Sequence, residues 1–422
     1  MTREATNSPR PRLPWAGKSV LMENIEQELA LLWRISADNM RVGQNIQVRT
    51  SILNLVICAP DVESAQRATA SLRHLSSTHL ARVTVVILDQ SEDIPASIST
   101  WITLRCFSII SDMMRHCFEQ TTLLVTGDAI DSIAHILQPL LKPHLPTYLW
   151  WLGDPPDNKA IFNNLVKLSN RIIVDSTSFF HPEQDIQTLA MLLQAAPDCA
   201  LSDLNWGRIT PWRQLIIQFF DVPDYRPYLD GITSIEVEHA AAPLATPTQT
   251  EQGEVSPNPA QALLLAGWLK ARLGWSLLAD RTQHAQDTAS GTYHWTLERS
   301  TPVKATRALS STRTKTGKLT GVKTANIDIR PQILSDMRPG SVSLVRLTSN
   351  IEGRQAVFTI NREDDPNHVL TSVELPQETR PRRTIRLVAS RPESQLLYDE
   401  LEIMGHDTPF EQTLQEVAEL LS

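Results

Sequence analysis

An alternation of strand-like and helix-like segments over residues 46–195 constrains this fold more than any other feature of the sequence. The strand-like segments are short, and residues 82–88 (RVTVVIL) are almost continuously apolar. Such a strand is typical of a parallel sheet whose two faces are both covered. The alternation therefore predicts a mostly parallel, Rossmann-like sheet. The predicted strands are 46–58, 82–88, 101–107, 121–125, 147–152 and 171–174, and the predicted helices are 61–75, 129–141, 158–168 and 183–195.

A further helix is predicted ahead of this sheet, over residues 20–35, with Ser19 as its N-cap. Its apolar residues fall at helical spacing on one face. Residues 1–18 contain basic residues and three prolines but no apolar core segment. We therefore expect a disordered leader there, and not a secretory signal.

The pattern changes in the second half of the chain. Residues 261–273 predict a strong helix, and the segments that follow alternate polar and apolar residues between turns. This alternation is typical of an antiparallel sheet with one solvated face. Two closing helices are predicted at 393–403 and 410–421. The predicted strands are 232–237, 293–299, 326–330, 341–348, 355–360, 368–373 and 384–388.

These patterns predict two domains. An α/β domain with its N-terminal helix would cover 19–238, and an α+β domain rich in antiparallel strands, with C-terminal helices, would cover 261–422. Residues 239–260 are proline-bearing and lack apolar periodicity, which predicts a flexible linker or loop.

Residues 203–221 (DLNWGRITPWRQLIIQFFD) stand out between these domains. Thr210 is predicted to cap a helix whose first position is taken by Pro211. The helix would carry one apolar face, because its large apolar residues recur at positions i, i+3, i+4 and i+7. These residues are Trp212, Leu215, Ile216 and Phe219.

The approach to this helix crowds indoles, guanidiniums, a carboxylate and an amide into a few residues. One interpretation is a structural corner, in which Asp203 pairs with Arg208 and the tryptophans fill a domain junction. The other is a recognition surface, since Trp and Arg most often anchor binding. The candidates for partner binding here are Asp203, Asn205, Trp206, Arg208 and Arg213.

Residues 203–221 resemble the signature segment of the OpcA family, the glucose-6-phosphate dehydrogenase assembly proteins. The resemblance runs from about residue 21 to the C-terminus. It implies a non-enzymatic protein, known notably in cyanobacteria, that binds glucose-6-phosphate dehydrogenase and allosterically favours its active oligomer in the oxidative pentose phosphate pathway. Four further segments agree with the family: RTSILNLVIC, LPTYLWWLGDPP, RIIVDS and LLLAGWLKARLGW.

The recognised signatures of cofactor and metal chemistry are missing from the sequence. It has no G-x-G-x-x-G, no G-x-x-x-x-G-K-[ST], no H-E-x-x-H and no G-x-S-x-G, and its histidines are scattered. We therefore expect no cofactor and no metal site. The net charge of −8 argues against a nucleic-acid partner. The sequence has no run of about 18 apolar residues, so it predicts no membrane span.

An alternative hypothesis is an α/β enzyme or binding protein that acts on a sugar phosphate. Asp175 and Ser176 follow a predicted strand, where α/β sheets often place ligand-binding residues. The same pair also suits an Asx turn or a helix cap. In this hypothesis Asp175 and Arg208 would line the crevice.

Two other features are candidates for partner binding. Trp150 and Trp151 alternate across a predicted strand, so one indole would be buried and the other exposed at the strand's end; the alternative is that both are core. The basic segment 299–323, with Arg313, Lys315 and Lys318, is either a mobile loop or an electrostatic arm for an acidic partner.

The four cysteines show no C-x-x-C spacing, which fits a reducing, cytoplasmic compartment. Cys58 lies in an apolar strand and is predicted to be an inert buried thiol. Cys106 and Cys117 are near enough in sequence to meet across a strand-to-helix turn. Because the OpcA family works in a pathway under light-dependent thiol control, the resemblance makes this pair the redox candidates and thioredoxin a further partner.

Overall fold

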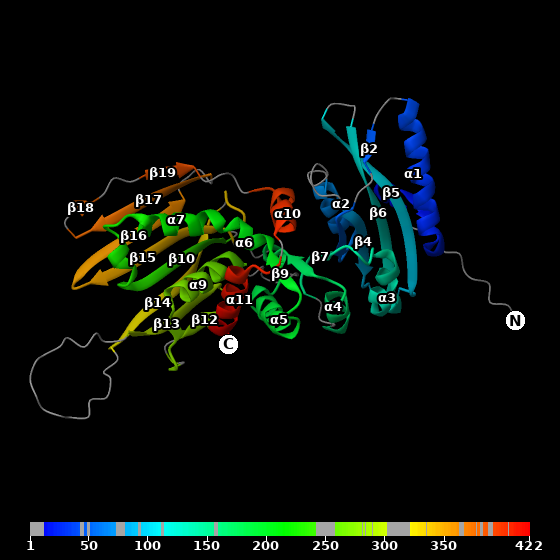
Figure 1. The fold of residues 1–422 in the computed structure, drawn as a ribbon. Coiled ribbons are helices and arrows are strands. Elements are labelled where there is room, and N and C mark those ends of the chain that lie inside the picture. The colour runs from blue at the N-terminus through cyan, green and yellow to red at the C-terminus, as the bar shows by residue number, and fades with distance from the viewer. Residues whose placement is uncertain are drawn as a thin grey trace, which may run out of the picture. The chain divides into compact units, whose positions relative to one another are not determined.

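The structure is a computed structural model that falls into two units, each built around one sheet (Figure 1). The first unit comprises Met1–Ser178, Leu192–Leu204 and Pro392–Asp407, and the second comprises the rest of the chain. The structure describes residues 12–42, 46–48, 51–72, 81–91, 94–110, 114–155, 159–241, 258–280, 282, 284–288, 290–301, 321–334, 336–362, 367–376, 378–379, 383–386, 391–403 and 405–422.

The first unit contains a mostly parallel sheet, as the alternation predicted. Its strand order is β1-β5-β6-β4-β3-β7-β8-β9, with β2 also paired to β6. Among the strand pairs that the structure describes in this sheet, only β1–β5 and β5–β6 are antiparallel. The strands are β1 (Lys18–Val20), β2 (Ile46–Val48), β3 (Leu53–Ala59), β4 (Ala81–Asp89), β5 (Ser97–Ile110), β6 (Met114–Thr126), β7 (Thr147–Trp151), β8 (Arg171–Val174) and β9 (Ala200–Asp203).

Every residue of β3 is buried, which is the state that a continuous apolar strand predicts for a sheet centre. Two details differ from prediction. The expected single strand 46–58 is two strands, β2 and β3, which pair with different neighbours. The expected strands 101–107 and 121–125 belong to a long antiparallel hairpin, β5–β6, because the chain between them reverses and does not cross over through a helix.

The helices of the first unit lie near their predicted positions, but their first residues are predicted less well. Asp61 caps α2, since its Oδ1 accepts the Ser64 amide at 2.7 Å. Ser19 is not a cap: it lies in β1 opposite Trp101, and the strand delays the first helix to Ile25. The main helices are α1 (Ile25–Val42), α2 (Val62–Ser71), α3 (Ile133–Leu137), α4 (Lys159–Val166) and α10 (Glu393–Glu402), while α5 (Pro182–Ala195) is shared with the second unit.

Part of the predicted leader belongs to the fold. Residues 1–11 lie outside the described residues, but Leu13 and Ala16 are buried in the apolar core of the first unit. Their burial, together with strand β1, orders the chain from residue 12 onward. The expectation of disorder is therefore wrong for residues 12–18.

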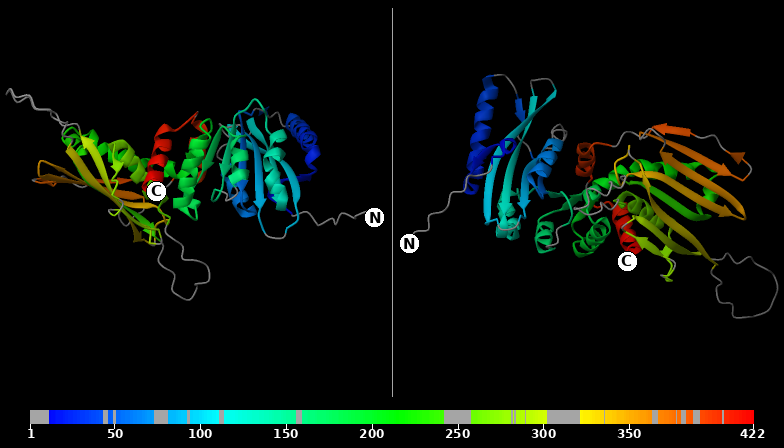
Figure 2. Two further views of the ribbon diagram at one scale, coloured as in Figure 1. Left: turned by 90° about the horizontal axis from the view of Figure 1, so that it is seen from below. Right: turned by 180° about the vertical axis from the view of Figure 1, so that it is seen from behind.

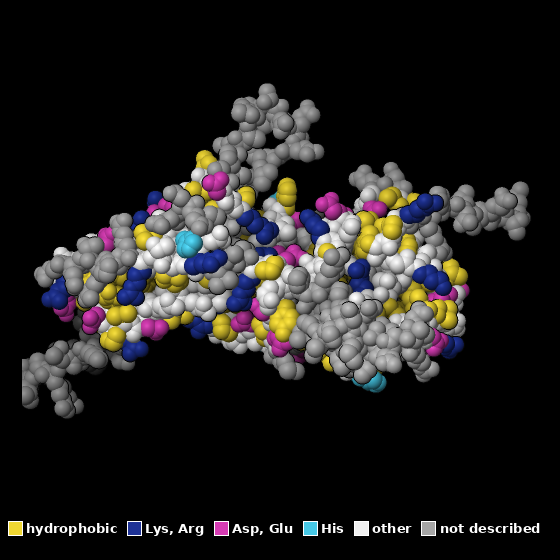
Figure 3. All heavy atoms as spheres, turned by 90° about the horizontal axis from the view of Figure 1, so that it is seen from above, with side chains coloured by type: hydrophobic (Ala, Val, Ile, Leu, Met, Phe, Trp, Pro, Cys, Tyr) yellow, Lys and Arg dark blue, Asp and Glu magenta, His cyan; other side chains and the backbone are white. Residues whose placement is uncertain are grey.

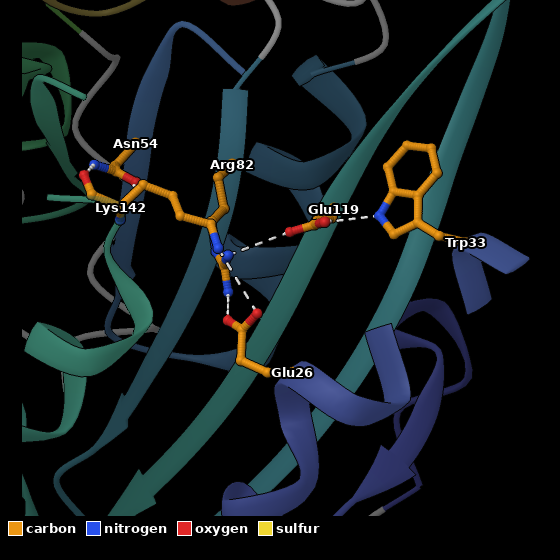
Figure 4. Close-up of polar contacts among 6 residues, drawn as sticks. All are labelled: Glu26, Trp33, Asn54, Arg82, Glu119 and Lys142. Carbon is orange, nitrogen blue, oxygen red and sulfur yellow. Dashed lines mark hydrogen bonds and ion pairs between the residues drawn. The ribbon is translucent and has the colours of Figure 1, made fainter. Parts of the chain in front are cut away.

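A polar network joins α1 to the sheet (Figure 4). The Arg82 guanidinium, 3% exposed, forms ion pairs with Glu26 and with Glu119, the latter at 3.4 Å between Nη1 and Oε2. Glu119 also accepts the indole N–H of Trp33, a residue of α1, at 2.7 Å. Buried charges persist where they are paired and hydrogen-bonded in this way.

A second buried arginine, Arg171, binds the segment that contains α10 to the first sheet. Arg171, at the start of β8, is 1% exposed and donates to the hydroxyl of Ser202 and to the carbonyls of Ile403 and Gly405. The carboxylate of Glu400, in α10, lies 3.9 Å away. Helix α10 thus packs into the first unit, with Leu396, Leu397 and Leu401 in its core.

The second unit contains a mixed sheet. Within the described part of this unit, only the β10–β14 pair is parallel. One row of paired residues crosses six strands and is buried throughout: Trp295, Ile327, Ile235, Leu347, Phe358 and Val373. The strands are β10 (Ile232–Ala241), β11 (Ser276–Leu277), β12 (Ala285–Asp287), β13 (Thr292–Thr301), β14 (Gly321–Ile333), β15 (Val342–Ile351), β16 (Arg354–Arg362), β17 (His368–Leu375), β18 (Glu378–Thr379) and β19 (Arg383–Arg386).

Helices α9 and α11 lie side by side in this unit (Figure 2). A Cβ on Gly267 of α9 would stand 2.5 Å from Val417 and 2.9 Å from the Thr413 carbonyl, so the glycine permits their close approach. Buried Lys270 forms ion pairs with Glu416 and Glu419. The helices are α6 (Leu204–Arg208), α7 (Thr210–Asp221), α8 (Arg226–Leu229), α9 (Ala260–Leu273) and α11 (Thr408–Leu420).

The units differ from the predicted domains. Residues 179–191 and 205–238, which the prediction placed in the first domain, belong to the second unit. Strand β10, which straddles the predicted end at residue 238, pairs with β14 and β15 of the second sheet. Helix α10 belongs to the first unit although it follows the second sheet in sequence. Within the predicted linker 239–260, residues 242–257 lie outside the described residues.

Candidate functional site

The signature stretch 203–221 ends β9 and then forms α6 and α7. The apolar face predicted for its helix is confirmed, since Trp212, Leu215, Ile216 and Phe219 are all buried. Thr210 is not the cap, however. The chain is already helical before it, with the Ile209 amide bonded to the Asn205 carbonyl at 3.2 Å, so Thr210 starts α7 as a helical residue.

Trp206 and Arg213 brace the junction between α6 and α7. The Arg213 guanidinium lies 3.3 Å above the centroid of the Trp206 indole. It also donates to the Trp206 carbonyl at 3.3 Å and to Oγ1 of Thr210 at 2.8 Å. Trp206 is 4% exposed and packs on Phe410, with ring centroids 5.7 Å apart. This pair therefore acts within the fold of the second unit.

Asn205 belongs to a buried amide relay that joins three elements. Nε2 of Gln261, in α9, donates to Oδ1 of Asn205 at 2.9 Å, and Oε1 of Gln261 accepts the Val342 amide of β15 at 3.1 Å. Sequence reasoning missed Gln261. The available signal was a single amide near the start of an otherwise strongly apolar helix.

Helix α7 borders a cavity of about 370 Å³ within the second unit, which we call the arginine cavity. Its lining within the described chain includes five arginines and one carboxylate, Asp336. Sequence analysis had singled out only Arg208 among them. The arginines are Arg208, Arg338, Arg362, Arg386 and Arg391.

Arg362 is the most fixed of these cations. Its Nε donates to the Val342 carbonyl at 3.1 Å, and its guanidinium lies 5.6 Å from the Trp212 ring centroid. Burial lowers the pKa of Arg362, although a guanidinium remains charged in proteins. In Figure 3, dark-blue Lys and Arg side chains lie over the face of the second unit that carries α7 and β19.

A second cavity, of about 300 Å³, shares Leu215, Gln218 and Ile385 with the arginine cavity. Its lining combines Phe219, Val222, Tyr225 and Val373 with polar residues, Arg383 among them. The two cavities are thus neighbours along α7.

The remaining candidates near the first sheet are buried. Trp150 is 0% exposed and Trp151 is 5% exposed, so the expectation of one exposed indole is wrong and both are core. The Trp151 N–H donates to the Asp154 carbonyl at 2.7 Å. Asp203, 2% exposed, accepts the Ser176 amide at 3.0 Å.

Asp175 is engaged in a local turn. Its Oδ1 accepts the amide of Thr177 at 3.1 Å and the Thr177 hydroxyl at 2.6 Å. This geometry is the Asx turn that the sequence allowed.

Cys106 and Cys117 form a disulfide. They lie directly opposite each other on the antiparallel strands β5 and β6, so a strand hairpin brings them together and not the expected strand-to-helix turn. Cys58 and Cys199 are free and buried, and burial raises the pKa of Cys58 to about 12 and that of Cys199 to about 11. Cys58 is therefore the inert thiol that was predicted.

The structure does not describe the three candidates of the basic segment. Arg313, Lys315 and Lys318 fall outside the described residues. Among the residues that are described, no group of three or more His, Cys, Asp or Glu side chains is placed to hold a metal ion. No helix in the described part of the chain is long and apolar enough to cross a membrane.

The chain matches two family models, one in each half. Residues 72–191 match the glucose-6-phosphate dehydrogenase subunit N-terminal domain, and residues 199–414 match the corresponding C-terminal domain. The second match includes α6, α7 and the arginine cavity. This chain belongs to the OpcA family of glucose-6-phosphate dehydrogenase subunits.

Relatives with the name "OxPP cycle protein OpcA" occur in cyanobacteria. The chain is 37% identical to that of Synechocystis sp. over 160 residues, which are 38% of this chain and 30% of the relative. It is 33% identical to that of Nostoc punctiforme over 189 residues, 45% of this chain and 36% of the relative. The matched parts thus span about a third of the relatives' own lengths.

Among solved structures, the chain is similar to a glucose-6-phosphate 1-dehydrogenase from Mycobacterium avium, with 12% identity and a TM-score of 0.45 over 88% of this chain and 90% of the other. It is also similar to a levoglucosan dehydrogenase bound to NADH, with 8% identity and a TM-score of 0.40 over 87% and 90% of the two chains. Scores this low carry no argument about activity or ligand.

Proposed function

We propose that this chain is a non-catalytic assembly factor that binds glucose-6-phosphate dehydrogenase and favours its active oligomer. The observation that carries the proposal is the family match in both halves of the chain, including the signature stretch. The names of the cyanobacterial relatives support a place in the oxidative pentose phosphate pathway. Such a factor acts allosterically only if it binds the active oligomer more tightly than the inactive form.

A partner can contact helix α7 of the signature stretch through its exposed side chains. Trp206 and Arg213 brace α7 from within, while Gln214, Ile217 and Gln218 are exposed. Ile217 is 50% exposed, so its apolar side chain is open to contact with a partner. We place the first contact with the dehydrogenase on this outer face of α7.

A titration of purified glucose-6-phosphate dehydrogenase with this protein tests the proposal. Activity should rise, or the apparent substrate KM should fall, together with a shift in oligomer mass. An unchanged activity and an unchanged mass at saturating protein would overturn it.

The proposed contact has its own matched pair of variants. Ile217→Asp should weaken activation of the dehydrogenase, while Ile35→Asp on α1, where Ile35 is 48% exposed, should not. Equal activation by both variants would move the contact elsewhere and leave the assembly function standing.

The basic segment that contains Arg313, Lys315 and Lys318 remains a second proposed contact. Reversing these three residues to Glu should slow association and flatten its salt dependence, because charges outside the contact mainly steer encounter. Unchanged association kinetics at low ionic strength would reduce the segment to a passive loop.

We propose further that the Cys106–Cys117 disulfide is a redox control and that the protein is cytoplasmic. Disulfides in a reducing compartment are usually transient, so this pair would be open to a dithiol such as thioredoxin. Two electrons and two protons convert the disulfide to two thiols as the reductant is oxidised. Intact mass should rise by two hydrogens on reduction in the parent but not in Cys117→Ser; no change in the parent ends the idea.

An enzyme acting on a sugar phosphate through Asp175 and Arg208 remains the alternative. It has less support, because the Asp175 carboxylate is occupied by a local turn. Turnover by the isolated chain, without any dehydrogenase, would establish the alternative in place of the assembly function.

A further inference from the structure

Strand β19 lies at one edge of the second sheet (Figure 1). It pairs with β17, and β17 pairs on its other side with β16. Among the strands that the structure describes, none pairs with the outer side of β19. The backbone N–H and C=O groups on that side can therefore pair with an added strand, as at other sheet edges.

The side chains of β19 show which kind of strand it can accept. Arg383 and Arg386 are both exposed, and neither side chain forms an ion pair or a hydrogen bond with the described residues. A second copy of β19, paired over its whole length, would set these arginines against each other, and like charges on neighbouring strands are destabilising. Carboxylates at the facing positions would instead form cross-strand pairs. The edge therefore favours an acidic segment over another copy of this chain.

Two cavities adjoin this edge. Ile385 lines both the arginine cavity and the second cavity, and Arg383 lines the second. Both side chains lie on the inner face of the sheet, because their partners in β17, Val369 and Thr371, are buried there. An added strand presents every second side chain to this same face. Charges alone can protect an edge from aggregation, whereas cavities beside it offer space for the side chains of an incoming strand.

The order of residues along β19 predicts the sequence of the segment. An antiparallel strand meets Arg386 first and Arg383 three residues later, and each of these positions favours a carboxylate. The residue after the first carboxylate faces Ile385 on the cavity side, where an apolar side chain fits. The next residue faces Thr384, which is exposed, and is therefore polar.

We propose that β19 binds an extended acidic segment of a partner protein as an added antiparallel strand, with carboxylates opposite Arg386 and Arg383. In this mode the backbone hydrogen bonds supply affinity, and alternate side chains directed to the cavities supply specificity. The proposal goes beyond the assembly function, because the segment need not come from the dehydrogenase.

Binding is measured by calorimetry on the full chain with a capped peptide that carries Glu-Val-Thr-Glu between threonine flanks. Replacement of both glutamates by lysine should weaken binding at least about tenfold, which corresponds to about 1.4 kcal/mol. Two further peptides carry N-methyl groups on alternate residues, each in one of the two possible registers. Only the register whose N–H groups face β19 should lose binding, because the other edge of the added strand faces solvent.

The matched variants are Arg383→Gln with Arg386→Gln, and Arg272→Gln with Arg354→Gln. All of these arginines are exposed, and only the first pair lies in β19. The first pair should weaken binding of the glutamate peptide at least about tenfold, because each arginine pairs with a carboxylate, and the second pair should leave binding unchanged. In the parent protein, amide hydrogen exchange at residues 383–386 should slow when the glutamate peptide is bound.

Four results would overturn the proposal. These are no binding of the glutamate peptide, equal binding of the lysine peptide, full binding by both N-methylated peptides, or equal loss of binding in both pairs of variants. Dimerisation of the chain with slowed exchange at β19 would also overturn it, and would assign the edge to a second copy. Activation of the dehydrogenase, measured separately, decides the assembly function whichever result is obtained.

Discussion

The two units use arginine in opposite ways. In the first unit Arg82 and Arg171 are 3% and 1% exposed, and each meets carboxylates or carbonyls that hold α1 or α10 on the sheet. In the second unit, five arginines and one carboxylate are among the described residues that line a cavity. The difference separates buried arginines inside the fold from arginines that border a cavity. Each prediction below tests this contrast.

The largest effect is expected at Arg82. Arg82→Met should lower the free energy of unfolding by about 3–5 kcal/mol, because Glu119 would stay buried without its cation. Chemical denaturation measures this loss. Adding Glu119→Gln should recover part of it, since the amide oxygen can still accept the Trp33 N–H, and Arg67→Met on the exposed side of α2 should change little.

A pH-dependent effect is expected at Glu400, beside Arg171. Burial raises the pKa of Glu400 to about 7 from an ordinary value of 4.5, outweighing the hydrogen bond from Ser202 and the Arg171 charge. The folded state therefore keeps a proton that the unfolded state has released, so this contribution to stability falls as pH rises from about 4.5 to about 7. The total change is roughly 2–3 kcal/mol.

Glu400→Gln removes this titration. Its unfolding free energy relative to the parent should rise between about pH 4.5 and about pH 7 and then level off. Glu402→Gln, at an exposed position of the same helix, is the control and should show no such trend. A pH-independent difference for Glu400→Gln would show that the carboxyl is ionised throughout.

A smaller effect is expected at Arg213, which is in the second unit but acts like the arginines of the first. Arg213→Met keeps the apolar stem and loses the contact over Trp206 and the hydrogen bond to Thr210. The unfolding free energy should fall by about 1–2 kcal/mol. A stable variant that no longer activates the dehydrogenase would instead assign Arg213 to the partner.

The smallest effect on stability is expected in the arginine cavity. Arg338→Gln with Arg386→Gln should change the unfolding free energy by less than about 0.5 kcal/mol, as exposed substitutions usually do. A slight gain is expected because two like charges are removed. A loss comparable to that of Arg82→Met would make these arginines structural and end the contrast between the units.

The sequence by itself determined the elements whose burial is periodic. The continuous apolar strand β3, the stripe through Trp212 and Phe219, and the alternating strands of the second sheet were predictable, because period and burial are local properties of the chain. The family was also predictable from ordered segments that carry tryptophan. Helix starts were less predictable from the sequence. Ser19 can cap a helix only if it is not part of a strand, and it lies in β1.

Only the tertiary structure decided which side chains meet across long separations. The row from Trp295 to Val373, the packing of α10 into the first unit and the pairing of Cys106 with Cys117 each depend on strand neighbours that periodicity cannot choose. The arginine cavity is the sharpest case. Arg208, Arg338 and Arg362 are separated in sequence and look like ordinary surface cations. They line one cavity because the fold of the second unit brings their segments together.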